Sequence, residues 1–545
     1  MERLMECSCI TPAELPGTTR LYSTFLSDFS RVAQFYRHPP SAKGMEESAR
    51  EIRLEDSVRR AVVEVLRKQN RSFGADDAAT TRNLDRLRDG AVAVVTGQQV
   101  GLFGGPAYSI YKALTAVHAA RELTERGVNA VPVFWLATED HDLAEVDHCF
   151  FPKRGGIERF DLPVSGLAER RVGEIQLGEA VRGLSAQVTE LLEGARAEEI
   201  GRWITESYAP EETFGSAFGK LMARIFAGRG LIFLDPMSPE LHRLSLPTML
   251  RAVKEHKTLS AELIARSAAL EKAGFHAQVK VTEQSTLVFR IVGGQRLALR
   301  AVNGRLAAGD KTESLDETLK AVEEHPEHFS PSALLRPVIQ DTLLPTVAYI
   351  AGAAEVAYHA QTSLVYEKLL GRAPAILPRA SFTLVPSHVY NLLKKYNLNV
   401  SDIVQERRKL RARLEAEALP HALTARFEEG DLVIKALIEG LRDPLTKLDQ
   451  TLIGALDTAS EKILYQFNGL RTKAGRAEGF RTGVLNTHEN EITSSLLPND
   501  ALQERSFGLL TFLASEGQEL LDHLDGHIKT GTGEHCFLFL QPAAK

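Results

Sequence analysis

Hydrophobic residues along the chain occur in two patterns, and the first of them predicts a parallel sheet. Five short segments are continuously apolar and rich in β-branched residues, as in strands that are buried on both faces. These segments are 92–95, 131–137, 231–234, 347–350 and 375–377. Residues 106–126 follow the first with apolar residues at helical spacing, Pro106 at the start and Gly127 just beyond the end. The order of strand, loop, helix and strand predicts an α/β fold: a Rossmann-like, doubly wound parallel sheet with inserted connective segments.

The regions between and after these strands carry other patterns. Residues 149–228 mix short strand-like and helical stretches. Residues 278–306 alternate in short runs broken by Gly293-Gly294 and Asn303-Gly304, which predicts small β-hairpins. The end of the chain predicts a helix around 502–524 and a terminal strand at 536–540.

The second pattern is a narrow apolar stripe in long, charged helices that begin near Ser401. Its members recur every three or four residues, as in a coiled-coil hairpin, and predict a C-terminal α-helical coiled coil. They are Leu445, Leu448, Leu452, Ala455, Ala459, Ile463, Phe467 and Leu470. Pro420 and Pro444 are expected to end or kink these helices. So narrow a stripe needs a partner, which is either the returning helix or a second subunit.

These patterns divide the chain into six parts. The Rossmann-like core is expected in three pieces, at 1–148, 229–277 and 331–390. An inserted connective segment at 149–228 and a small β insertion at 278–330 separate them, and a helical coiled-coil region follows at 391–545.

Composition excludes several classes of protein. The chain has 545 residues, 44% of them hydrophobic and 25% charged, enough for two or three domains with large cores. Its net charge is −6, so no overall basic field favours nucleic acid as a partner. No apolar run approaches the ~20 residues of a membrane span, and the N-terminus lacks the apolar region of a signal peptide. We therefore expect a cytoplasmic protein that acts on neither nucleic acid nor membrane.

The four cysteines indicate neither a disulfide framework nor a zinc site, because no pair has Cys-x-x-Cys spacing. Cys7 and Cys9 are expected to be reduced thiols near the terminus. No resident metal is expected. None of the four is expected to act as a nucleophile, since Cys149 has no adjacent general-base pattern and the others lie near the termini.

A glycine-rich loop follows the first predicted strand. Its spacing matches neither a Walker loop nor a dinucleotide fingerprint, but its place before a helix suits a phosphate or carboxylate. Lys112 and Tyr108 lie off the apolar stripe of that helix and can face a crevice. Alternatively, the glycines only permit close helix packing and Lys112 is solvated. The candidate ligand contacts here are Thr96, Gly97, Gln98, Gln99, Gly104, Gly105, Tyr108 and Lys112.

A polar cluster follows the second strand, where the apolar sequence changes to Glu139, Asp140, His141 and Asp142. Ligands of open parallel sheets bind beyond the carboxyl ends of the strands, so this cluster and the glycine loop should meet at one edge. A carboxylate or imidazole here can accept a proton from an amine, hold a cationic amine, or hold Mg²⁺. The alternative is a polar turn that caps the next helix.

Two further segments bring charge to strand ends. Arg336 and Gln340 precede the fourth strand, Glu355 follows it, and Arg379 follows the fifth. Arginine suits bidentate binding of carboxylate or phosphate, although structural ion pairs explain these residues equally well.

Four stretches together resemble one known family over nearly the full length. They are TGQQVGLFGGPAYSIYKA, PVFWLATEDHDLAEV, LLRPVIQDTLLPTVAYIAGAAEVAY and LQERSFGLLTFLASEG. They resemble the bacillithiol biosynthesis cysteine-adding enzymes, a family of cysteine ligases. The resemblance implies a Rossmann-like core, inserted connective segments, and a coiled coil through which the family forms homodimers. It also implies the last step of bacillithiol synthesis, in which L-cysteine is joined to glucosaminyl-malate through an amide bond.

The sequence departs from the family pattern at three positions, which hold Gly104, His359 and Gly508 where the family usually has Thr, Trp and Asn. The last departure lies in the segment where a second nucleotide site is expected, at Gln503, Glu504 and Arg505.

Amide formation from a free carboxylate has a poor leaving group, so activation of cysteine by ATP or another nucleotide is expected. In this hypothesis the glycine turn and Lys112 bind the anionic partner. Glu139, Asp140 or His141 accepts the amine proton, and Arg336 or Arg379 holds the malate carboxylates. Lys112 and His141 are expected at the surface, where replacing either costs little stability. Two alternatives stay open: a ligase for another amino acid and amino sugar, and a non-catalytic coiled-coil dimer that binds a metabolite.

Overall fold

The centre of the molecule is a five-stranded parallel sheet built from the five predicted strands. The computed structural model describes residues 7–15, 17–153, 155–164, 167, 169–405, 407–417, 419 and 421–540. The strand order is β13-β12-β2-β3-β6, and every neighbouring pair is parallel. The strands are β2 (Val92–Gln98), β3 (Ala130–Leu136), β6 (Ile232–Leu234), β12 (Thr346–Ala351) and β13 (Ala375–Pro378). The predicted α/β class and parallel sheet are confirmed.

Helices cover both faces of this sheet, which explains why its strands are apolar without alternation. In β3, Phe134 and Leu136 belong to one buried cluster, whereas Val131, Val133 and Trp135 belong to another. The first cluster includes residues of α5 (Tyr108–Glu125) and α8 (Phe214–Ile225), and the second includes residues of α1 (Arg20–Ser27), α3 (Asp56–Phe73) and α13 (Ala353–Leu370). The remaining helices of the core are α2 (Ala42–Glu51), α4 (Ala78–Arg88), α9 (Pro239–Lys254), α10 (His256–Lys272) and α12 (Arg336–Leu343).

The two insertions have the predicted mixed character. The first holds the hairpin of β4 (His148–Lys153) and β5 (Gly156–Asp161), then α6 (Ala180–Glu190), α7 (Ala197–Ser207) and α8. The second is an antiparallel sheet of order β10-β9-β8-β7-β11. Its two predicted turns have positive φ at Gly293, Gly294, Asn303 and Gly304, as tight hairpins require. Its elements are β7 (Ser285–Val292), β8 (Gln295–Val302), β9 (Arg305–Ala308), β10 (Lys311–Glu313), α11 (Leu315–Glu324) and β11 (Phe329–Pro331).

The two ends of the chain meet in a third sheet of order β1-β15-β14. Its strands are β1 (Cys7–Ile10), β14 (Ser381–Val385) and β15 (His535–Phe539). Antiparallel pairing of β1 with β15 places Cys9 opposite Cys536, and the two form a disulfide. The expectation of a reduced Cys9 and no disulfide is therefore wrong, because the pairing joins residues 527 positions apart that no local spacing connects.

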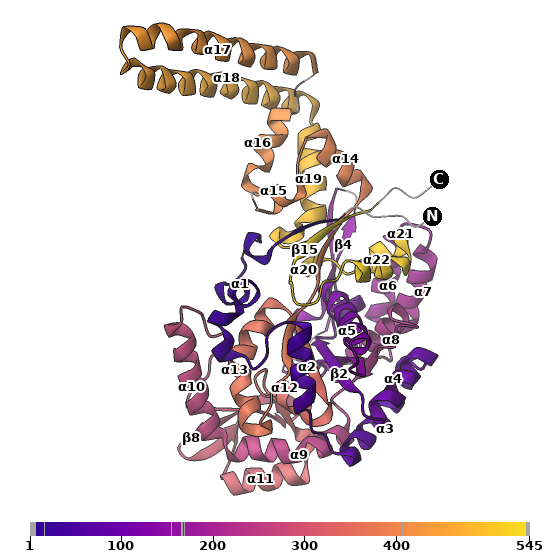
Figure 1. Cartoon of the computed structure of the whole chain (residues 1–545). Helices are drawn as coiled ribbons and strands as arrows, with labels where there is room; N and C mark the ends of the chain where they lie inside the picture. The colour runs from indigo at the N-terminus through magenta and orange to yellow at the C-terminus, as the bar shows by residue number, and fades with distance from the viewer. Residues whose placement is uncertain are drawn as a thin grey trace.

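A helical arm projects from the body and ends in the antiparallel hairpin of α17 (His421–Leu448) and α18 (Leu452–Thr482) (Figure 1). The predicted coiled coil is thus present, but its stripe is wrong, because the turn at 449–451 divides it. Leu448 and Leu470 are 76% and 56% exposed. Phe467, a member of the predicted stripe, does pack between the two helices, with its ring centre 5.3 Å from that of Phe427. The arm's other helices are α14 (Ser387–Lys395), α15 (Val400–Gln405), α16 (Arg407–Glu417) and α19 (Val484–Leu496).

One expectation near the C-terminus changes. Pro444 lies inside α17 and does not end it, so a kink there stays a prediction, and Pro420 lies outside the described residues. The single helix predicted at 502–524 is instead three short helices, because Phe507 is extended and Gly517 has a positive φ. These helices are α20 (Gln503–Ser506), α21 (Leu510–Glu516) and α22 (Glu519–Gly526). In the described part of the chain, every helix is too short or too polar to span a lipid bilayer.

Candidate active site

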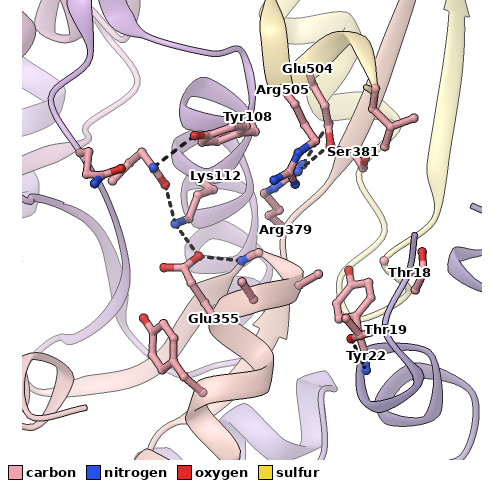
Figure 2. A pocket seen from close by; sticks show the side chains of 18 of the residues that line it. Thr18, Thr19, Tyr22, Tyr108, Lys112, Glu355, Arg379, Ser381, Glu504 and Arg505 are labelled. Carbon is pink, nitrogen blue, oxygen red and sulfur yellow. Dashed lines mark hydrogen bonds and ion pairs between the residues drawn. The ribbon is translucent and has the colours of Figure 1, made fainter. Parts of the chain in front are cut away.

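A cleft of about 910 Å³ opens at the carboxyl ends of the central strands. The chain runs from β2 to β3 and β6 on one side, and later returns to β12 and β13 on the other. The strand order therefore reverses between β2 and β12, which is where open α/β sheets bind ligands. Thr18, Thr19 and Tyr22 complete one wall, and Glu504 and Arg505 complete another (Figure 2). Both ends of the chain thus contribute to a cleft that the central sheet positions.

Lys112 lies at this reversal point, on α5, and is buried rather than solvated. Its side chain is only 2% exposed, and its Nζ lies 2.6 Å from Oε2 of Glu355 at the start of α13. It also donates hydrogen bonds to the Gly97 carbonyl oxygen and to Oε1 of Gln98. Burial lowers the pKa of Lys112, while the nearby ammonium group helps hold the pKa of Glu355 below its ordinary value. The expectation of a surface lysine is wrong, because its partner comes from a distant part of the sequence.

Arg336 lies on the same side of the cleft, beside two aromatic rings. Its guanidinium carbon is 5.7 Å from the ring centre of Trp135 and 5.4 Å from that of Tyr349. It donates to Oε1 of Gln340 and to the hydroxyl oxygen of Tyr349, which in turn donates to Glu355. Gln340 is fully buried and orients Arg336 from behind. This network presents a fixed cation to the cleft.

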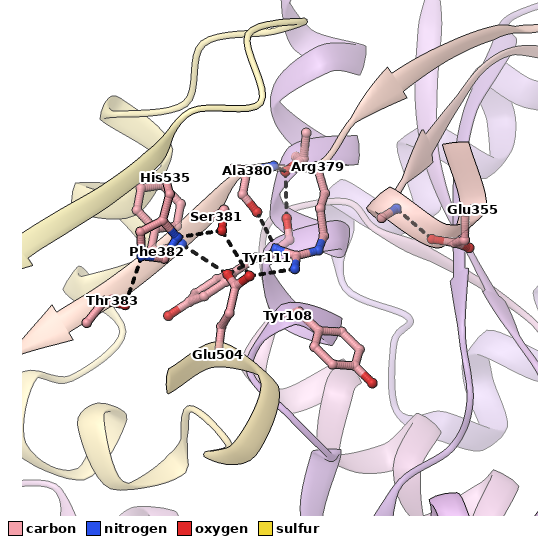
Figure 3. Close-up of polar contacts among 12 residues, drawn as sticks. Tyr108, Tyr111, Glu355, Arg379, Ala380, Ser381, Phe382, Thr383, Glu504 and His535 are labelled. Atoms are coloured by element: carbon pink, nitrogen blue, oxygen red, sulfur yellow. Dashed lines mark hydrogen bonds and ion pairs between the residues drawn. The ribbon is translucent and has the colours of Figure 1, made fainter. Parts of the chain in front are cut away.

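Arg379 presents a second cation, which the C-terminal segment holds in place (Figure 3). Both terminal nitrogens of Arg379 donate to the carboxylate of Glu504, which is only 1% exposed. Glu504 also accepts hydrogen bonds from the Ser381 hydroxyl and the Phe382 N–H. Gln503 is likewise buried and bonds to the backbone of β14. The side chains of Gln503 and Glu504 are therefore engaged within the protein, whereas Arg505 is exposed and lines the cleft.

The acidic cluster after β3 divides between the cleft and the interior. Asp140 lines the cleft and accepts hydrogen bonds from Gln99 Nε2 and the His141 N–H. Burial acts to raise the pKa of Asp140, but the hydrogen bonds from His141 and Gln99 and the charge of Arg296 hold that pKa well below its ordinary value. Asp140 is therefore a carboxylate suited to holding a cationic amine rather than to taking its proton.

Glu139 points away from Asp140 toward the interior. Its Oε1 lies 3.4 Å from Nε2 of His242, and neither atom has a hydrogen-bond partner among the described residues. Burial raises the pKa of Glu139 to about 7 and lowers that of His242 to about 4. No local pattern pointed to His242, which lies on α9, about 100 positions later in the chain.

His141 and Asp142 also lie outside the cleft. Nδ1 of His141 accepts a hydrogen bond from Arg296, which reaches it from β8 of the second insertion. Asp142 is exposed at the start of a short 3₁₀ turn. The local sequence pattern could not connect Arg296 with the acidic cluster after β3, because the second insertion folds back to bring Arg296 to His141.

The glycine turn does not form the expected anion site. Gly104 and Gly105 have φ values of +88° and +65°, which favour glycine, but their N–H groups donate within the protein. The N–H of Gly104 bonds to the Tyr208 hydroxyl, and the carbonyl oxygen of Gly105 lies beside Gly508. The turn therefore packs against the first insertion and the C-terminal segment. The sequence analysis offered two interpretations of these glycines, an anion site or close helix packing, and this geometry favours close packing.

The structure thus brings together many of the sequence-predicted residues. Those after β2 and β3 that line the cleft are Gly97, Gln98, Gln99, Tyr108, Lys112 and Asp140. Those from the later segments are Arg336, Glu355, Arg379, Glu504 and Arg505. Those that the cleft lining does not include are Thr96, Gly104, Gly105, Glu139, His141, Asp142, Gln340 and Gln503. The cleft lining also includes residues that the sequence did not predict, because their pattern is that of ordinary core or loop residues. They are Thr18, Thr19, Tyr22, Trp135 and Tyr349.

Comparison with known proteins places the chain in one family over almost its entire length. Residues 5–380 match the N-terminal Rossmann-like domain of bacillithiol biosynthesis BshC, and residues 382–540 match its C-terminal coiled-coil domain. A protein of Koribacter versatilis named "Putative cysteine ligase BshC" is 42% identical, with 95% of this chain and 96% of that one covered. Proteins of the same name from Solibacter usitatus and Salinibacter ruber are 35% and 30% identical, covering 97% and 96% of this chain and 99% and 97% of theirs. The chain belongs to the BshC family of bacillithiol biosynthesis.

Proposed function

We propose that this protein is a ligase that joins L-cysteine to the amine of glucosaminyl-malate through an amide bond, completing bacillithiol. The observation that carries the proposal is the gathering in the cleft of three arginines and of Asp140, a carboxylate that is not paired with a lysine or arginine of the cleft lining. Arg336, Arg379 and Arg505 suit the carboxylates of a malate group, and Asp140 suits a cationic amine. A cleft of about 910 Å³ has room for both substrates and falls within the usual range for ligand sites.

Residues of the cleft fall into three roles under this proposal. Arg336 and Arg379 are held by buried partners, so each meets an anionic group without first having to be ordered. Asp140 holds the substrate amine close to the cysteine carboxyl group, which favours reaction by proximity and orientation. The ammonium form gives its proton to solvent before the neutral amine attacks. Lys112 and Glu355 fix the geometry between β2 and β12, on which both arginines depend.

A nucleotide is proposed as the source of activation. ATP or another nucleotide would, when bound, supply the activated carboxyl group that amide formation needs. The cationic side chains of the cleft fit its phosphates, whereas the glycine turn does not, since the N–H groups of Gly104 and Gly105 are already used. At the proposed second nucleotide site, Arg505 is the exposed candidate, because Gln503 and Glu504 are buried.

A homodimer through the arm is also proposed, in a protein that acts in the cytoplasm. Leu432 and Leu437 of α17 are 69% and 66% exposed, and Leu448 at its end is 76% exposed. Apolar side chains that gather on one element mark interaction surfaces. A second copy of the arm is the proposed partner, because it carries the same exposed leucines and can cover these.

The experiment is to incubate purified protein with cysteine, glucosaminyl-malate and one nucleotide at a time. Mass spectrometry then detects bacillithiol together with AMP or ADP. We expect bacillithiol with one nucleotide, and no product when serine replaces cysteine. Product from another amino acid or amino sugar would favour a different ligase, and tight binding without turnover would favour the non-catalytic alternative.

A further inference from the structure

Three sulfur atoms gather where the two ends of the chain pair in the third sheet. Cys9 on β1 is bonded to Cys536 on β15, and Sγ of Cys7 lies 3.6 Å from Sγ of Cys9. Cys9 is exposed and Cys7 is partly exposed, whereas Cys536 is 4% exposed. The fourth cysteine, Cys149, is buried on β4 and is a free thiol. The disulfide therefore presents one accessible sulfur, with a free thiol beside it.

This arrangement is suited to exchange rather than to permanent cross-linking. Exchange requires a thiolate to reach one sulfur of the disulfide, and Cys9 lies on the edge strand of its sheet. Burial raises the pKa of the Cys7 thiol, and this effect is larger than the lowering of that pKa by the charge of Lys529. Cys7 is thus mostly protonated, and an external thiol is the first attacker. Disulfides inside cells are rare and, where they occur, are usually transient or redox-sensing.

We propose that Cys7, Cys9 and Cys536 form a modification site at which a low-molecular-weight thiol exchanges with the disulfide and becomes attached to Cys9. The proposal rests on the sulfur geometry and not on the ligase activity.

The exchange balances without any further reactant. The thiolate of the small molecule bonds to Sγ of Cys9, and the bond between Cys9 and Cys536 breaks. The bonding electron pair leaves with the sulfur of Cys536, which takes a proton. A second molecule of thiol then attacks the sulfur of the attached group, releasing the disulfide of the small molecule and the Cys9 thiol. In total, two small thiols are oxidised to one disulfide, and the protein disulfide is reduced to two thiols.

The same bond fastens two walls of the cleft. From β1 the chain leads into the segment with Thr18, Thr19 and Tyr22, and Gly533 lies just before β15. Within the third sheet Cys536 is also paired with Phe382, whose N–H donates to Glu504. A small second cavity is lined by both Cys536 and Arg379. Reduction removes a link between distant parts of the chain, so these walls should become more mobile.

The test uses the full-length protein, purified without reductant and equilibrated with mixtures of cysteine and cystine. Mass spectrometry of unreduced, thiol-blocked protein and its peptides then reports each sulfur. We expect the Cys9–Cys536 link in cystine, a cysteinyl group on Cys9 at intermediate ratios, and free thiols in excess cysteine. Cys149→Ser, whose sulfur is buried elsewhere, should give the same pattern. Cys536→Ser should lose the link, while the Cys9 thiol should still take a cysteinyl group from cystine and release one cysteine.

Two results would overturn the proposal. One is four unmodified thiols in cystine-equilibrated wild-type protein, and the other is cysteinylation of Cys149 as readily as of Cys9. Hydrogen exchange tests the coupling to the cleft. Amides in residues 17–22 and 529–534 should exchange faster after reduction, and unchanged exchange in both segments would refute that coupling. Because these measurements use the wild-type protein, they stay informative even if a variant fails to fold.

Discussion

Replacing Lys112 by methionine should destabilise the protein far more than an ordinary lysine substitution. Methionine keeps much of the volume of the side chain but removes the ammonium group, which leaves the Glu355 carboxylate without its cationic partner. Breaking a buried ion pair by removing one partner costs about 3–5 kcal/mol. The side chain of Glu355 is 20% exposed and keeps bonds from the Tyr349 hydroxyl and the Gly352 N–H. We therefore expect a loss near the lower end, about 3 kcal/mol in the free energy of unfolding.

The loss should also depend on pH, with a sign that the structure fixes. In the wild type, Lys112 helps hold the pKa of Glu355 low, so the pair contributes stability above the pKa of an unfolded glutamate. In Lys112→Met, burial is no longer offset by the ammonium group, and the pKa of Glu355 rises. The folded variant then binds a proton more readily than the unfolded chain, so its deficit should be larger at pH 8 than at pH 5. Adding Glu355→Gln should recover part of the loss and most of its pH dependence.

Urea unfolding followed by tryptophan fluorescence measures this effect in the correct part of the molecule. The chain has two tryptophans, and Trp203→Phe leaves only Trp135, which is 1% exposed in β3. Lys320→Met is the matched control, because Lys320 is 73% exposed and should change stability by less than about 0.5 kcal/mol. A loss below about 1 kcal/mol for Lys112→Met at both pH values would refute the buried pair and restore the surface position inferred from the helical pattern.

Three further outcomes are expected. Burial raises the pKa of Glu139 from 4.5 to about 7, so the wild-type protein loses stability as the pH rises through that range. The stability of Glu139→Gln relative to wild type should therefore increase between about pH 5 and pH 8. A difference in melting temperature between the two proteins that is the same at both pH values would contradict this. Cys149→Ala should form bacillithiol at the wild-type rate, since burial raises the pKa of that thiol far above neutrality, and an inactive but folded variant would show that it is needed for catalysis. Leu432→Glu with Leu437→Glu should convert a dimer into monomers in light scattering, because an interface would bury the new charges, and a wild-type monomer at micromolar concentration would remove the dimer proposal.

The sequence predicted the central sheet because burial on both faces leaves a local mark. The apolar runs of β2, β3, β6, β12 and β13 are continuous, and each became a strand of the parallel sheet. The rule that ligands bind at the carboxyl ends of such strands then located the cleft before its walls were known. Residues directly after those strands, such as Gln99 and Asp140, do line this cleft, as that rule predicted.

The remaining features depend on contacts between distant segments. The helical pattern of α5 indicated which face of that helix meets the sheet, but not that Glu355 lies against Lys112. His242 and Arg296 reach the acidic cluster from α9 and β8, and the Cys9–Cys536 bond joins the two ends of the chain. The coiled coil of the arm was predicted correctly, but its apolar stripe was wrong, because the three-to-four spacing continued through the turn at 449–451. Spacing alone does not show where one helix ends and the next begins.

The cleft as the site of amide formation is tested most directly at Arg505, which lines it and is exposed. The measurement is the initial rate of bacillithiol formation by mass spectrometry, for wild type and Arg505→Ala at matched protein concentration. Arg182→Ala, a 67% exposed arginine of α6, is the control. Losing a charged hydrogen bond of about 1.5–3 kcal/mol should lower the rate by about tenfold to 100-fold, with the melting temperature unchanged and Arg505→Lys intermediate. If Arg505→Ala forms bacillithiol at the same rate as both the wild type and the Arg182→Ala control, the chemistry takes place outside this cleft.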